Sequence, residues 1–301
     1  MTNKLKGTLS IMLATVIWGS TFVAQSIGLN FVGPYTFLAV RCVLAVIILL
    51  MILFFLNRKQ FIATITDPKL WKAGIPCGIA LFTATALQQV GLMYTTTSKA
   101  GFITTMYIIL VPIFGLFLEQ KPPKTVGLGV VLAVIGLYFI SGADFSAINF
   151  GDALMLGCAA AFAVQILIMD RVAGQLNSLA LNMAQALVCA VLSSIFAAFF
   201  DTVVWGNIVA CWFPLFYAGV LSMGFAYTLQ IVGQKAIEPT TASLLMSFES
   251  VFAALSGMAA TALGWLNEKP LRLIEWLGCA LVFAAIMLTQ IPEKTTKKAP
   301  V

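Results

Sequence analysis

The chain contains no histidine and few charged residues. Of its 301 residues, 9% are charged, whereas a soluble domain carries roughly a quarter. The missing imidazoles exclude Ser-His-Asp triads, Cys-His pairs and histidine metal sites. The six cysteines form no CxxC pair, and we interpret them as small buried hydrophobes. No GxxxxGK[ST] loop is present, so ATP is not the expected energy source.

Long apolar blocks dominate what remains, and 61% of the residues are hydrophobic. Most blocks approach the ~20 residues that an α-helix needs to cross a bilayer. We therefore predict an all-α integral membrane protein with ten transmembrane helices. The predicted spans are residues 7–28, 34–56, 72–93, 99–118, 125–141, 152–170, 178–200, 211–232, 239–262 and 273–291.

The basic residues are distributed unevenly over the predicted loops. If the N-terminus is cytoplasmic, thirteen Lys and Arg residues lie in inside segments and three lie outside: Lys99, Lys269 and Arg272. Cytoplasmic loops of membrane proteins carry such an excess. We expect a multi-pass protein of the inner (plasma) membrane with both termini in the cytoplasm. The scattered charge, +6 in total, forms no stripe suited to nucleic acid.

The two halves of the chain show weak internal similarity. An offset of 144 aligns Gly7 with Gly151, Trp18 with Phe162 and Arg41 with Gln185, and an offset of 142 aligns Gly91 with Gly233 and Ala100 with Ala242. Five spans per half is an odd number, so the second half must enter the membrane from the opposite side. This pattern predicts two inverted five-helix repeats, residues 1–141 and 151–292, followed by a cytoplasmic tail, residues 293–301.

Two charged residues lie within predicted spans. Glu249 is ten residues past Pro239, which places it about 15 Å along its helix, near the bilayer midplane. Such a carboxyl must face the bundle interior or be protonated. Arg41 lies about 10 Å from the outer end of its helix. It snorkels outward, attracts an anion near the outer mouth, or acts as a charge partner for Glu249.

Several polar and aromatic side chains are further candidates for a cavity between the halves, and packing between helices is the alternative role for each. The predicted cavity residues are Trp18, Thr21, Gln89, Tyr107, Gln165 and Glu249. Pro112 removes the hydrogen bond to the carbonyl of Ile108 and should kink the fourth span. The sequence suggests no metal site and no cofactor.

Short motifs occur across the whole chain: residues 16–22 (VIWGSTF), 89–101 (QVGLMYTTTSKAG), 111–114 (VPIF), 249–255 (ESVFAAL), 267–268 (NE) and 276–278 (WLG). Together they resemble drug/metabolite transporters of the EamA type. Ser250 stands where the family commonly has a proline. The resemblance implies two five-helix repeats around a central cavity that faces each side of the membrane in turn. It also implies export of amino acids, other metabolites or toxic compounds.

The expected function is secondary-active export of a small metabolite by alternating access. The partners would be a small-molecule substrate, the lipid bilayer and a coupling proton, while the oligomeric state stays open. One alternative is a non-transporting sensor or assembly factor. A membrane enzyme acting on lipids is a weaker alternative, because such an enzyme needs paired carboxylates or a nucleophile with its base. Glu249 has no evident acidic partner at its depth.

Overall fold

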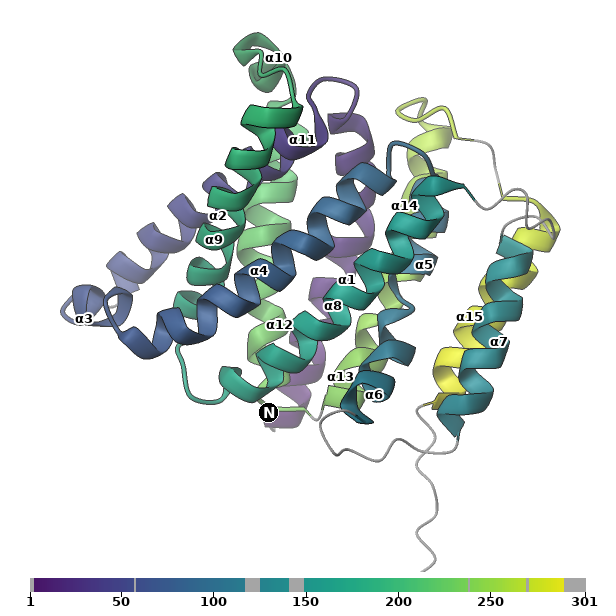
Figure 1. Ribbon diagram of the computed structural model, residues 1–301, viewed down its shortest axis with the longest axis horizontal. Coiled ribbons are helices and arrows are strands. Elements are labelled where there is room, and N and C mark those ends of the chain that lie inside the picture. Colours follow the sequence, from purple (N-terminus) through teal and green to yellow (C-terminus); the bar gives the residue numbers. More distant parts are fainter. Residues whose placement is uncertain are drawn as a thin grey trace, which may run out of the picture.

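Every regular element in the described part of the chain is a helix (Figure 1). The computed structural model describes residues 3–56, 58–116, 125–140, 149–237, 239–268 and 271–289. Its first half contains α1 (Asn3–Gly28), α2 (Pro34–Leu56), α3 (Phe61–Ile65), α4 (Pro68–Gly91), α5 (Thr97–Thr104), α6 (Tyr107–Leu116) and α7 (Thr125–Ile140). Its second half contains α8 (Phe150–Ala173), α9 (Ser178–Phe200), α10 (Trp205–Ala210), α11 (Trp212–Phe216), the π-helix η2 (Tyr217–Ala226), α12 (Tyr227–Gln234), α13 (Pro239–Met246), α14 (Phe248–Ala262) and α15 (Leu273–Thr289).

Seven helical stretches are long and apolar enough to cross a membrane. They are α1, α2, α4, α5 with α6, α8, α9, and α11 with η2 and α12. The other predicted spans coincide with shorter helices: the fifth with α7, the ninth with α13 and α14, and the tenth with α15. The structure therefore supports a helical multi-pass membrane protein, and the number of ten spans stays a prediction.

The third span begins earlier than the sequence pattern indicated. We predicted its start at residue 72, but α4 begins at Pro68. The Asp67 side chain accepts a hydrogen bond from the Lys69 amide at 2.8 Å, and the proline occupies the first turn, where no helical N–H is needed. Local capping thus extends the helix beyond its apolar stretch.

The fourth span is broken, and the break lies before Pro112, the residue at which the sequence predicted a kink. The chain leaves α5 at Thr105 and resumes helical geometry at Tyr107, whereas Pro112 lies inside α6. The Thr105 hydroxyl donates to the carbonyl of Phe102 at 2.8 Å. Side-chain bonds of this kind compete with the helical ladder and often bend helices.

The ninth span is broken in the corresponding place. Ser247 separates α13 from α14, and the Ser250 hydroxyl donates to the Ser247 carbonyl at 2.8 Å. This helix is interrupted although no proline occupies position 250. The breaks at Thr105 and Ser247 are separated by 142 residues, which is one of the offsets found in the sequence.

The eighth span contains an unexpected π-helix. Over η2 the backbone departs from the α-helical pattern, and the Asn182 side-chain amide donates to the carbonyls of Met223 and Gly224 at 3.0 and 2.8 Å. These bonds help to satisfy backbone carbonyls in an apolar environment, and Gly224 O also accepts from the Thr228 hydroxyl at 2.7 Å. π-Helical turns frequently accompany functional sites.

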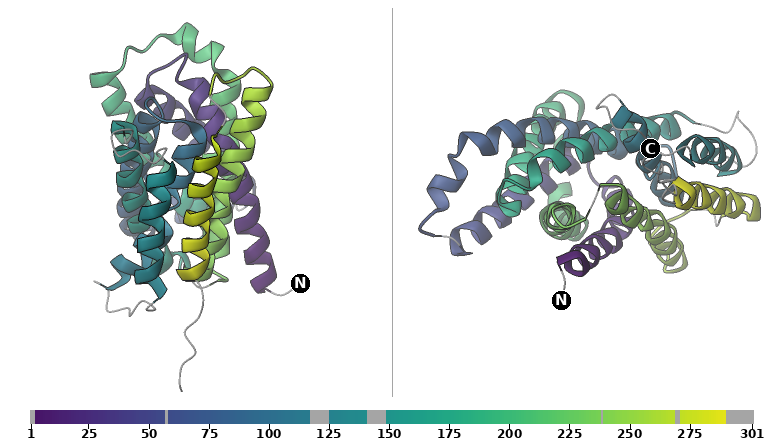
Figure 2. Two further views of the ribbon diagram at one scale, coloured as in Figure 1. Left: turned by 90° about the vertical axis from the view of Figure 1, so that its right-hand side faces the viewer. Right: turned by 90° about the horizontal axis from the view of Figure 1, so that it is seen from below.

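The helices pack in corresponding pairs from the two halves. α1 packs against α14, η2 and α12, whereas α8 packs against α5, α6 and α4; α2 lies against α9, and α7 lies along α15 at one edge (Figures 1 and 2). Gly19 allows α1 to approach α14 closely, because a Cβ there would lie 2.7 Å from the Ala253 amide nitrogen and 2.8 Å from the Glu249 carbonyl. Small residues commonly serve this purpose between membrane helices.

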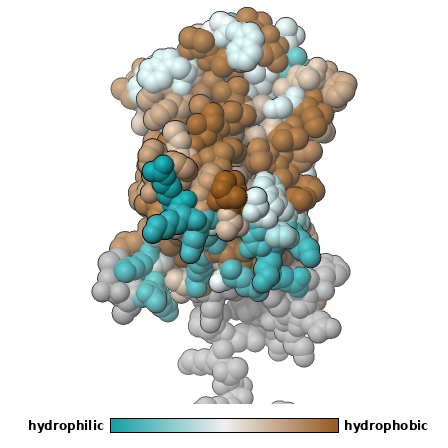
Figure 3. All heavy atoms as spheres, turned by 90° about the vertical axis from the view of Figure 1, so that its left-hand side faces the viewer, coloured by the Kyte–Doolittle hydropathy of each residue, from teal (hydrophilic) through white to brown (hydrophobic). Residues whose placement is uncertain are grey.

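Large apolar side chains cover the outside of the helices. Val43, Ile47 and Met51 lie along one exposed face of α2, while Arg41 and several glutamines are buried. Figure 3 shows such a face, with hydrophobic side chains in its middle and upper parts and hydrophilic ones towards the end where the N-terminus lies in Figure 1. A surface of this kind suits a lipid environment.

Candidate functional site

A small cavity lies among the helices and is surrounded by polar side chains. Its volume is about 30 Å³, which is room for about two water molecules. Five of the residues singled out in the sequence line it: Trp18, Thr21, Arg41, Tyr107 and Glu249. They come from α1, α2, α6 and α14, which belong to different halves of the chain. A metabolite could enter only if this conformation widened.

Glu249 is the acidic group of the cavity. It is the second residue of α14, immediately after the break at Ser247, and it is 7% exposed. The Tyr107 hydroxyl donates a hydrogen bond to Glu249 Oε2 at 3.4 Å. This bond is longer than the usual 2.5–3.0 Å for an O–H···O contact. The carboxyl is therefore held loosely by its tyrosine partner.

Arg41 is the basic group of the same cavity. It is 3% exposed, and its Nη1 donates to Gln25 Oε1 at 2.8 Å. Snorkelling towards the surface, one of the sequence interpretations, is therefore wrong. Arg41 and Glu249 both lie in the described part of the chain and form no ion pair there. The cavity thus contains opposite charges that do not neutralise each other by direct contact.

Trp18 and Thr21 occupy one face of α1 towards the cavity. The Trp18 ring lies against Tyr227, with ring centroids 5.0 Å apart and an interplanar angle of 59°. The Thr21 hydroxyl donates to the Ile17 carbonyl, a bond that satisfies it within its own helix. The indole nitrogen of Trp18 has no hydrogen-bond partner among the described residues.

Two of the predicted cavity residues lie outside the lining. Gln89 is fully buried without lining the cavity, and its neighbour Gln88 lines the cavity instead. Gln165 belongs to a chain of hydrogen-bonded amides that reaches the cavity only through Gln230. Its Nε2 donates to Gln185 Oε1 at 3.2 Å, and its Oε1 accepts from Gln230 Nε2 at 3.5 Å.

Other lining residues were not among the predicted cavity residues, although Gln88 and Gln230 were expected to point into the bundle. They include Gln25, Gln88, Phe162, Ser222, Tyr227 and Gln230. The repeat offsets carried a signal for some of them: Gln88 and Gln230 are 142 residues apart, and Trp18 and Phe162 are 144 apart. Aligning polar residues between the halves would have favoured Gln88 over Gln89. Ser222 gave no such signal, because it depends on the π-helix.

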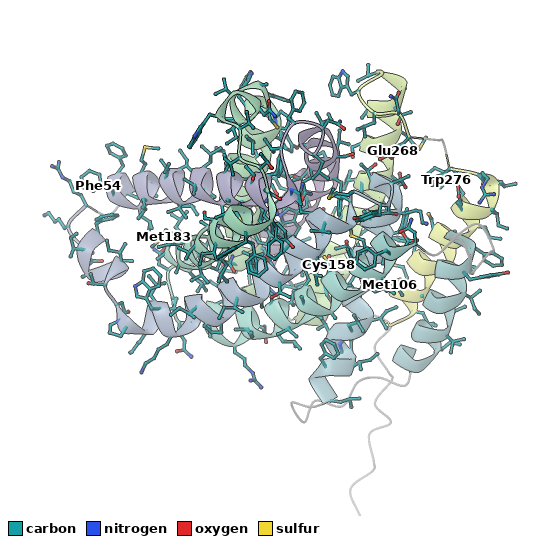
Figure 4. The ribbon with its side chains drawn as sticks, turned by 45° about the horizontal axis from the view of Figure 1, so that its top comes forward. Phe54, Met106, Cys158, Met183, Glu268 and Trp276 are labelled. Carbon is teal, nitrogen blue, oxygen red and sulfur yellow. The ribbon has the colours of Figure 1, made fainter. Side chains whose placement is uncertain are left out.

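Figure 4 labels Met106, in the break between α5 and α6, and Cys158 of α8, which packs against both helices. This arrangement brings the broken fourth span next to the sixth. Within the described residues, no group of three or more Cys, Asp or Glu side chains is placed to hold a metal ion. The lining consists of hydroxyls, amides, aromatic rings, one carboxyl, one guanidinium and the apolar side chains of Ile166 and Met246.

The chain is similar to known proteins along its whole length. The EamA-like transporter family matches residues 5–142 and again residues 149–291. An uncharacterized transporter of Archaeoglobus fulgidus is 32% identical over 96% of this chain and 87% of its own length. The threonine/homoserine exporter RhtA of Escherichia coli K12 is 31% identical over 61% of this chain and 60% of its own length.

The uncharacterized transporter YoaV of Bacillus subtilis is similar over most of its length as well, at 24% identity over 94% of this chain and 96% of that protein. One solved structure superposes with a TM-score of 0.68 at 20% identity, covering 94% of this chain and 95% of that one. The fold of this chain is therefore similar to the fold of that protein.

Proposed function

Because the chain belongs to the EamA-like transporter family, we propose that it is a secondary-active exporter of a small metabolite such as an amino acid, an amine or a toxic compound. It works by alternating access, with the cavity open to one side of the membrane at a time. In this proposal the protein lies in the inner (plasma) membrane with both termini in the cytoplasm.

The observation that carries this proposal is the cavity between the halves of the chain. It combines a buried carboxyl, a buried guanidinium and several amides and hydroxyls. Ionisable groups within a membrane are expensive to bury and commonly mark substrate or ion pathways. The small volume of the cavity fits a closed conformation that must widen to admit its substrate.

A two-repeat architecture supports alternating access. Tyr107 and Glu249 follow the two helix breaks, are 142 residues apart and meet in the cavity. Gln88 and Gln230 have the same separation and line the same space. These relationships favour ten helices arranged as inverted repeats, residues 1–141 and 151–292. The predicted tail, residues 293–301, lies outside the described residues.

Glu249 offers a route to proton coupling. A carboxyl that is removed from water is more easily protonated than an exposed one, because burial disfavours its charged form. Glu249 can hold a proton in one state of the cycle and a cationic substrate group in the other. Exchange of the two would couple proton entry to metabolite exit.

The orientation is supported by the charges at the two ends of the molecule. Lys4, Lys6, Arg58, Lys69 and Lys72 lie in α1 and around the α2–α4 connection, at one end. The other end, where α8 begins and α9 and α14 have ended, holds fewer basic residues, among them Lys99, which pairs with Asp152. An excess of basic residues is typical of the cytoplasmic side.

Efflux from proteoliposomes tests the function. The purified chain is reconstituted, loaded with labelled amino acids, amines or cationic dyes, and given a pH gradient of either sign. We expect gradient-dependent movement of at least one compound class. Binding of these compounds without any transport would instead favour the sensor or assembly-factor alternative. Chemical conversion of added lipids would favour the membrane enzyme.

A further inference from the structure

Two cysteine side chains from different halves of the chain touch in the interior. The Cys42 thiol of α2 donates to the Cys189 sulfur of α9, with the two Sγ atoms 3.4 Å apart. Both side chains are fully buried, and both are free thiols. A disulfide bond is about 2.0 Å long, so the two sulfurs need to approach by about 1.4 Å to form one. A small shift of either helix covers this distance.

The helices that carry the two thiols occupy corresponding places in the two halves. α2 begins at Pro34 and α9 at Ser178, and they end at Leu56 and Phe200, so both ends differ by 144 residues, one of the offsets found in the sequence. The two helices pack against each other (Figure 1). A bond between the two sulfurs would therefore tie one half of the chain covalently to the other.

The two thiols belong to a row of hydrogen-bonding groups. The Thr85 hydroxyl of α4 lies 3.8 Å from Cys189 Sγ and donates its own proton to the Leu81 carbonyl at 2.7 Å. Its oxygen is therefore available to accept the proton of the Cys189 thiol. The Cys42 thiol in turn points to the Cys189 sulfur. Each thiol proton thus has an acceptor, which matters because the thiolate and not the thiol is the nucleophile in sulfur chemistry.

We propose that Cys42 and Cys189 form a redox-sensitive modification site, at which a membrane-soluble organic hydroperoxide produces a disulfide that arrests the protein. One sulfur attacks the hydroperoxide, whose O–O bond breaks. This sulfur becomes a sulfenic acid, and an alcohol leaves with the thiol proton. The second sulfur then attacks the first, the S–O bond breaks, and hydroxide leaves with the second thiol proton as water. Two thiols are oxidised to one disulfide, and the hydroperoxide is reduced to one alcohol and one water.

Both thiols are next to residues that shape the cavity. Cys42 follows Arg41, which lines the cavity, and Cys189 lies one helical turn after Gln185 of the amide chain. At Gly219, η2 approaches α2 so closely that a Cβ would lie 2.8 Å from the Arg41 carbonyl.

A disulfide at this place opposes the opening of the cavity. The helices that line the small cavity, α2 among them, must separate to admit a metabolite. A covalent bond from α2 to α9 restrains this movement. The arrest rests on the proposed transport function, whereas the formation of the bond does not.

Mass mapping of the purified full chain tests the bond. The protein in lipid nanodiscs is treated with cumene hydroperoxide in excess, denatured, and its remaining thiols are blocked with N-ethylmaleimide. We expect a linked pair of peptides that contain Cys42 and Cys189, while the other four of the six cysteines are blocked. Dithiothreitol should separate the pair again. Absence of this linked pair from the wild-type protein overturns the modification site.

Variants show whether the linkage is specific. Cys42→Ala and Cys189→Ala should each abolish the linked pair of peptides. Cys77→Ala is the matched control, because Cys77 is also fully buried, and the linkage should form in it as in wild type. The melting temperature before oxidation shows whether each variant is folded. Linkage of Cys42 or Cys189 to a different cysteine in the wild-type protein would contradict the proposed pairing.

Efflux from proteoliposomes tests the arrest. Treatment with the hydroperoxide should lower the wild-type rate to that of liposomes without protein, and dithiothreitol should restore it. Cys42→Ala should keep its rate under the same treatment. A complete disulfide with an unchanged efflux rate overturns the arrest. A complete disulfide in a protein whose reduced form transports no compound overturns the proposed function and supports the modification site.

Discussion

The Tyr107 hydroxyl and Glu249 Oε2 are joined by a 3.4 Å hydrogen bond, although the two residues are 142 positions apart. Each lies just after a break in its helical stretch, Tyr107 at the start of α6 and Glu249 near the start of α14. The bond therefore links corresponding places in the two halves of the chain. A movement that separates the halves at the cavity must break it.

We expect Tyr107→Phe to speed the opening of the cavity and raise the transport rate by roughly two- to ten-fold without unfolding the protein, since a net hydrogen bond contributes about 0.5–1.5 kcal/mol and this bond must break during the cycle. The phenyl ring preserves the packing in the cavity wall and removes only the hydroxyl. Initial rates in proteoliposomes measure the effect. Tyr94→Phe is the matched control, because Tyr94 is exposed outside the cavity. Unchanged rates in Tyr107→Phe would show that the bond has no part in the cycle.

Glu249→Gln should abolish the dependence of efflux on an imposed pH gradient, because an amide cannot exchange the proton that the carboxyl exchanges. Any residual substrate movement should follow the substrate gradient alone. The measurement compares efflux with and without the pH gradient. Glu275→Gln, which removes an exposed ion pair with Arg272, should behave as wild type. Full gradient dependence in the Glu249 variant would return this residue to a packing role.

Gly19→Ala should destabilise the protein, since its Cβ would meet the Ala253 amide nitrogen at 2.7 Å and the Glu249 carbonyl at 2.8 Å. Overpacking of this kind costs about 1–3 kcal/mol. The melting temperature in detergent should fall by several degrees. Gly206→Ala is the matched control, because nothing lies within 4 Å of a Cβ at that position. Equal melting temperatures for both variants would argue against the close α1–α14 contact.

Reporter fusions after the C-terminal residue should be active only with a cytoplasmic reporter. The reason is the thirteen-to-three distribution of basic residues between the predicted inside and outside segments. A fusion in the loop between α9 and α11, around residue 203, should give the opposite pattern. An active periplasmic reporter at the C-terminus would mean that the C-terminus lies outside, against the predicted orientation or the predicted even number of spans.

The sequence by itself determined the helical membrane character of this protein. Long apolar blocks must satisfy their backbone groups internally, and a helix does so within one segment. The same local physics placed Glu249 near the middle of its segment. The kink that it predicted at Pro112 stays a prediction, and the break that the structure shows in the fourth span lies at Thr105.

Only the tertiary structure decided how each helix is rotated and what its polar groups meet. Gln88 and Gln89 are neighbours of equal polarity, yet only Gln88 reaches the cavity, because the packing of α4 against α8 and α9 sets its rotation. Arg41 pairs with Gln25 for the same kind of reason. Such contacts join residues that are distant in the chain, and no local periodicity specifies them.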